Sequence, residues 1–115
     1  QMNVVGGLNS NYACYLGLSA GGAFNGVMTE EEMMAEVWSQ EDDIRSETLD
    51  WVYSYLALAY QTLEDEELEA YTAMSLTPAG EALNTALFAS FDALFTTISR
   101  ELGTAAAQLM AGEDI

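Results

Sequence analysis

The segment from Leu63 to Gly103 constrains the fold of this chain more than any other stretch. A short run with helical character is interrupted at Thr77-Pro78, and a long run follows in which apolar residues recur every three or four positions. This spacing is typical of one face of an α-helix. Thr77 can cap the second helix, and Pro78 suits its first position because the N–H that proline lacks has no partner there. The sequence therefore predicts a short helix, a tight break and a long helix.

The long helix after Pro78 carries one apolar seam. A seam of this kind normally faces other helices. Phe88 and Phe95 widen it to a second face, and Gly80 would allow a neighbouring helix to approach closely, since glycine has no side chain. The seam follows steps of four, four, three, four, four, three and four residues: Leu83, Leu87, Phe91, Leu94, Ile98, Leu102, Ala105 and Leu109.

The residues before this segment also follow helical patterns. Apolar residues at helical spacing predict a first helix over 3–18, and the glycine-rich stretch 19–28 predicts a loop. Acidic residues crowd the first turn of a short helix at 64–75, which Thr62 is expected to cap.

Between the loop and the short helix, the sequence predicts a long helix that begins at Thr29 and ends near Tyr60. Thr29 is followed three residues later by Glu32, and this pair is typical of a capping box. The polar run around Gln40 interrupts the apolar pattern, so a kink or short break there is the alternative.

These elements predict an all-α fold for the whole chain. No strand pattern is present, and Pro78 is the only proline. We expect an antiparallel helical bundle of about four helices, two of them long and one short. At 115 residues, the chain is expected to form one domain over 1–115.

The charge balance excludes several classes of partner. The chain has 19 Asp and Glu residues against two arginines and no lysine or histidine, for a net charge of −17. Nucleic acids and anionic membrane surfaces attract basic proteins, so we expect binding to neither. The apolar runs are too short to cross a bilayer, which predicts no membrane insertion. A cationic partner remains open.

Residue types needed for most catalytic and metal sites are missing. There is no histidine and only one cysteine, Cys14, so neither a zinc site nor a Ser-His-Asp arrangement can be assembled. The acids over 41–50 lie on a predicted helix and project around it, unlike the ligands of a calcium loop. We expect no catalytic residue, metal or cofactor. A hydrolase that uses buried carboxylates is the one catalytic alternative.

Two further sets of residues are candidates for structural roles. Asp92 lies among apolar residues and would need a partner, for which Arg45 or Arg100 would form a buried ion pair. Trp51 and Tyr53 fall off the main apolar stripe of their helix, so they are candidates for an interface.

Two motifs carry a resemblance to a known family. DEELEAY at 65–71 and TPAGEALNTALFASFDALF at 77–95 resemble the bacterial family known as domain of unknown function 2059. The motif of that family has an acidic turn and a short helix that ends in a Pro-Ala-Gly step. The similar step in this chain runs from Thr77 to Gly80. The similarity is clearest over 60–110.

The segments 3–18 and 36–60 look similar to the exported alphaproteobacterial branch of that family. The resemblance implies an exported, periplasmic protein in which this chain is the C-terminal part of a longer protein. It implies no activity, because none is established for the family.

Taken together, these patterns favour a non-catalytic protein–protein interaction or structural module of the bacterial envelope. Its partner would be a second copy, the upstream region of the same protein, or another protein. The alternative is a carrier of a small apolar ligand or lipid, with a cavity between helices. Residues expected around such a cavity are Phe88, Phe91, Phe95, Met33 and Met34.

Overall fold

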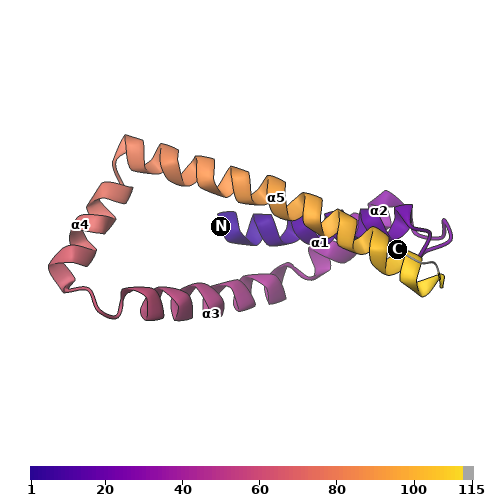
Figure 1. The fold of residues 1–115 in the computed structure, drawn as a ribbon, viewed down its shortest axis with the longest axis horizontal. Coiled ribbons are helices and arrows are strands. Elements are labelled where there is room, and N and C mark those ends of the chain that lie inside the picture. The colour runs from indigo at the N-terminus through magenta and orange to yellow at the C-terminus, as the bar shows by residue number, and fades with distance from the viewer. Residues whose placement is uncertain (113–115) are drawn as a thin grey trace.

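The computed structural model describes residues 1–112, and within that range it contains five helices and no strand (Figure 1). The all-α prediction is confirmed, with one helix more than the four expected. The helices are α1 (Met2–Ala20), α2 (Glu30–Ser39), α3 (Glu41–Tyr60), α4 (Asp65–Ser75) and α5 (Pro78–Met110).

The additional helix arises at Gln40, where the predicted long helix divides into α2 and α3. The backbone of Gln40 has φ −91° and ψ 0°, outside the helical values, and its N–H bonds to the carbonyl of Val37 at 3.1 Å. The side chain of Gln40 accepts a hydrogen bond from Asn11 on α1 at 2.9 Å. The break that the sequence offered as an alternative is therefore what the chain adopts.

Two capping boxes begin helices, and one lies where the sequence predicts it. The Thr29 hydroxyl accepts from the Glu32 N–H at 3.2 Å, and the Glu32 carboxylate accepts from the Thr29 N–H at 2.7 Å. The predicted cap of α4 at Thr62 is wrong, because Glu64 caps that helix. Glu64 has the extended backbone that a cap needs, and its N–H donates to the Glu67 carboxylate at 3.0 Å.

Helices α1 and α5 lie side by side and run in the same direction (Figure 1). Their backbones touch at glycines: a Cβ on Gly17 would overlap the carbonyl of Arg100, and a Cβ on Gly103 would overlap the carbonyl of Cys14. Such contact requires residues without side chains at the crossing. The parallel pairing corrects the expectation of an antiparallel bundle for these two helices.

The hydrophobic core is small and lies where α1, α2 and the first turns of α3 meet. Val4, Leu8 and Val37 form its buried cluster, and Ile44 packs against it from α3. Helices α3 and α4 contain no buried residue.

As a result, the chain is open rather than compact. Helices α3 and α5 diverge toward α4, which joins them beyond the N-terminus of α1 (Figure 1). The radius of gyration is 18.3 Å, against about 13 Å for a compact domain of this length. The bundle prediction is therefore confirmed only in its helical class.

Candidate functional site

A line of large apolar side chains runs along α5 and is exposed over the length of the helix. Each member is between 45% and 63% exposed. These residues are most of the seam predicted from the sequence, and we call them the outer apolar stripe: Leu83, Leu87, Phe91, Leu94, Ile98, Leu102 and Leu109.

Most of the outer apolar stripe lies on the side of α5 that faces away from α1, and Phe91 lies at its border, where it lines a hollow with the first turns of α1. At 3.6 residues per turn, Leu94 lies on the opposite side of the helix from Gly103, which is buried against α1. The expectation that the seam faces another helix of the chain is thus corrected. Large side chains would hold the helix backbones apart, so the glycine side of α5 contacts α1 and the leucine side remains exposed.

The segment of α5 that carries most of the outer apolar stripe, residues 82–99, contains almost no charge. Residues 82–99 contain one ionisable side chain, Asp92. It lies on the α1 side, where it accepts a hydrogen bond from Asn9 at 3.0 Å. Glu101 follows Leu94 by seven residues, which places it on nearly the same side of α5, beside Leu102, so one acidic residue borders the C-terminal half of the stripe.

The predicted ion pair between Asp92 and an arginine does not form among the described residues. Asp92 bonds to the amide of Asn9 instead. Arg45 forms a salt bridge with Glu41, one turn away on α3, and both side chains are partly exposed. The correction follows from the fold, because Asp92 sits against α1 within reach of Asn9 while Arg45 reaches an acid on its own helix.

Aromatic side chains of α3 form a second exposed surface. Trp51 and Tyr53, the predicted interface residues, are 64% and 70% exposed. Trp51 stacks on Tyr55 one turn later, with ring centroids 5.2 Å apart and planes 10° apart. Where α3 is joined to α4, Tyr60 and Tyr71 lie with centroids 5.7 Å apart.

The Thr77–Gly80 step joins α4 to α5. The Thr77 hydroxyl accepts from the Gly80 N–H at 3.1 Å and donates to the Met74 carbonyl at 2.6 Å, so one side chain links the end of α4 to the start of α5. Pro78 is the first residue of α5. Gly80 is buried, and a Cβ there would overlap the Met74 carbonyl. The motif therefore fixes the junction between α4 and α5.

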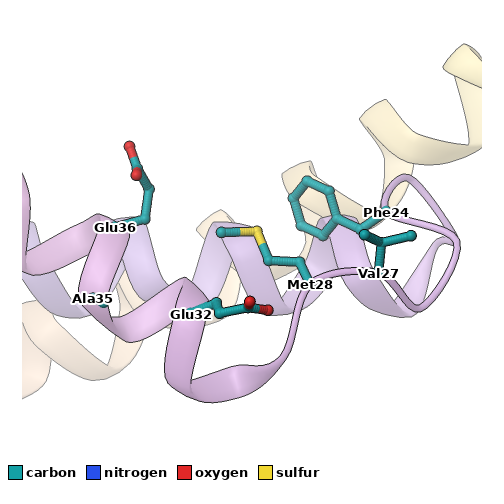
Figure 2. A pocket seen from close by; sticks show the side chains of 6 residues that line it. All are labelled: Phe24, Val27, Met28, Glu32, Ala35 and Glu36. Carbon is teal, nitrogen blue, oxygen red and sulfur yellow. The ribbon is translucent and has the colours of Figure 1, made fainter.

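A hollow lies between α2 and the loop that precedes it (Figure 2). Its volume is about 700 Å³. The loop contributes apolar side chains and α2 contributes two carboxylates, so the hollow is apolar at one side and acidic at the other. Its lining residues are Phe24, Val27, Met28, Glu32, Ala35 and Glu36.

The phenylalanines and Met33, expected around one carrier cavity, line different hollows. Phe88, Phe91 and Phe95 line a hollow of about 220 Å³ beside the start of α1. Met33 lines a separate hollow near Thr104. The predicted cluster of phenylalanine and methionine is therefore divided between two places.

Within residues 1–112, no three Cys, Asp or Glu side chains are grouped as metal ligands would be. Over the same range, no helix combines the length and the apolar character that a membrane span requires. Comparison with family models, with curated proteins and with solved structures finds no match.

Proposed function

We propose that this chain is a non-catalytic interaction module that binds protein through the outer apolar stripe of α5. The observation that carries the proposal is the alignment of seven large apolar side chains, all about half exposed, on one side of a single helix. Monomeric proteins rarely expose contiguous apolar patches larger than a few hundred Å², and larger patches mark interaction sites.

The charge distribution supports a protein as the occupant of the stripe. A net charge of −17 opposes nucleic acids and anionic lipid surfaces. The stripe itself lacks charge between residues 82 and 99 on its exposed side, so a partner can bury it without burying an unpaired ion. An apolar helix face of this length suits helix–helix packing. On the sequence resemblance alone, we also propose that the protein is exported to the bacterial envelope.

Site-specific photo-cross-linking tests the proposal directly. A benzophenone amino acid would replace Leu94 in the stripe or, as the matched control, Ala93, which is exposed on another side of α5. Irradiation in cells that express the chain should give protein adducts from position 94 and few from position 93. Absence of protein adducts at position 94, with the chain folded, would overturn the proposal.

A second candidate is a carrier of small apolar ligands at the hollow that Met28 lines. Its volume of about 700 Å³ falls in the usual range for small-molecule sites. Native mass spectrometry tests this candidate: a small mass that is bound in the native chain, lost on denaturation and missing from Met28→Glu would support it. A clean chain mass in all samples would count against it.

A further inference from the structure

We infer that the occupant of the outer apolar stripe is a second copy of this chain, packed antiparallel against the first about a two-fold axis near residue 96 of α5. The inference rests on the proposed function and names its partner. Three observations carry it: the surface area of the single chain, the spacing of the stripe and the position of the charges.

The exposed area of the single chain matches what a stable dimer would bury. The accessible surface is 8249 Å². A compact monomer of 12.5 kDa would expose about 6,200 Å². The excess of about 2,000 Å² is more than the ~800 Å² that each partner contributes to a standard interface, and it falls in the range of permanent homodimers. The excess belongs to the whole open chain, α3 and α4 included, and it is large enough to contain an obligate dimer interface of which the outer apolar stripe is one part.

The spacing of the stripe makes it complementary to itself when reversed. A two-fold interface brings residue i of one copy to residue j of the other, and j to i. With the axis at residue 96, three pairs are symmetric: Leu83 with Leu109, Leu87 with Ala105, and Leu94 with Ile98 of the other copy. The same symmetry places Phe91 opposite Glu101 of the other copy, with Leu102 one residue further along. Three of the four pairs are therefore apolar on both sides, and the fourth brings Phe91 beside a glutamate and a leucine.

The stripe also stays on one side of the helix along its length. Its steps of four, four and three residues repeat every eleven positions, so one turn corresponds to about 3.67 residues. This period is close to the 3.6 residues of an α-helix, and the stripe therefore drifts little around α5. A straight stripe allows two helices to remain in contact from end to end.

The charges would not prevent the pairing of two acidic chains at this face. Asp92, the one acid within 82–99, bonds to Asn9 on the α1 side and remains outside the interface. Glu101 is the one acid of the paired segment on this side, and it would lie beside Phe91 of the other copy, about 15 Å along the helix from the second Glu101. A basic partner would find its complementary charge on the acidic first turns of α2, α3 and α4 rather than on the stripe.

Cysteine cross-linking tests whether two copies of the chain pair through α5 and whether the two α5 helices run antiparallel. In a Cys14→Ala background, Leu83→Cys and Leu109→Cys would be made as separate, differently tagged chains. The two positions are about 39 Å apart along one helix, at 1.5 Å per residue. Antiparallel pairing predicts rapid cross-linking between the two kinds of chain when mixed, and slow cross-linking of either kind alone. Rapid cross-linking of Leu83→Cys alone would overturn the antiparallel arrangement.

Sedimentation velocity gives an independent readout of the pairing. The chain should sediment as a dimer, and Leu94→Glu should raise the dissociation constant at least about 30-fold, as expected when a central interface residue is lost. Leu87→Glu is a second variant with the same expectation, and Ala93→Glu is the matched control that should remain dimeric. Circular dichroism would verify that each variant is helical. A monomer at every concentration would overturn the inference.

The photo-cross-linking experiment separates this inference from the proposed function. Adducts of twice the chain mass from position 94 would support both. Adducts of other masses, together with a monomeric chain, would support the proposed function and overturn the second copy. No adduct would overturn both.

Discussion

The Thr104 hydroxyl of α5 lies 3.2 Å from the carbonyl oxygen of Gly17 on α1, and this hydrogen bond between helices forms where the two backbones touch. A residue with a side chain at position 17 would separate the helices and break the bond. The crossing of α1 and α5 is the longest helix contact in the described part of the chain, so its glycines are expected to be the most sensitive positions of the fold.

Gly103→Ala should destabilise the chain by about 1–3 kcal/mol, the usual cost of forcing atoms into a packed contact. The added Cβ would overlap the backbone of Cys14, which cannot move without moving α1. Urea unfolding followed by circular dichroism measures the change. Gly6→Ala is the matched control on α1, because a Cβ there would meet Asp92 at an ordinary 3.9 Å. That variant should be unchanged or more stable by about 0.5–1 kcal/mol, since alanine favours helix. Equal stability of the two variants would contradict the crossing.

Thr77→Ala should cost about 1 kcal/mol, because it removes the cap of α5 and the hydrogen bond to the end of α4. Thr77→Ser keeps the hydroxyl and should retain most of the stability. Thermal unfolding of the three proteins compares them. A serine variant as unstable as the alanine variant would show that the threonine methyl, and not the hydroxyl, matters at this junction.

The Glu32 capping box should make stability depend on pH in the acidic range. Hydrogen bonds from the backbone and side chain of Thr29 lower the pKa of Glu32 below its ordinary value of 4.5. A lowered pKa means that the carboxylate stabilises the folded chain above pH 4.5, and that this contribution is lost as the pH falls through the pKa of the folded state. Glu32→Gln should therefore reduce the acid-induced loss of stability.

Urea unfolding at a series of pH values from neutral to acidic measures this dependence. Glu31→Gln is the control, since Glu31 occupies the same first turn and takes no part in the capping box. The expectation fails if Glu31→Gln flattens the pH profile as much as Glu32→Gln does.

Local features of this fold could be predicted from the sequence, and long-range packing could not. The capping box at Thr29 and the Thr77-Pro78 helix start depend on residues three positions apart or fewer, so their patterns are sufficient. Which face of α5 packs against α1 depends on competition between its large apolar residues and its small residues. Its large apolar residues predict a seam in the core, yet the small face with Gly103 packs on α1 because α1 presents Gly17 to it. That match joins residues more than eighty positions apart, and no local period reveals it.

Salt should strengthen the proposed dimer. Each chain has a net charge of −17, so two copies repel each other over their acidic surfaces while their uncharged stripes attract. Raising the ionic strength from 0.1 M to 1 M shortens the screening length from about 10 Å to about 3 Å and removes most of this repulsion. The dissociation constant measured by sedimentation should fall as NaCl rises, and Leu94→Glu should remain weaker than the unaltered chain at every salt concentration. A dimer that dissociates in high salt would instead be held by ion pairs, which the outer apolar stripe cannot supply.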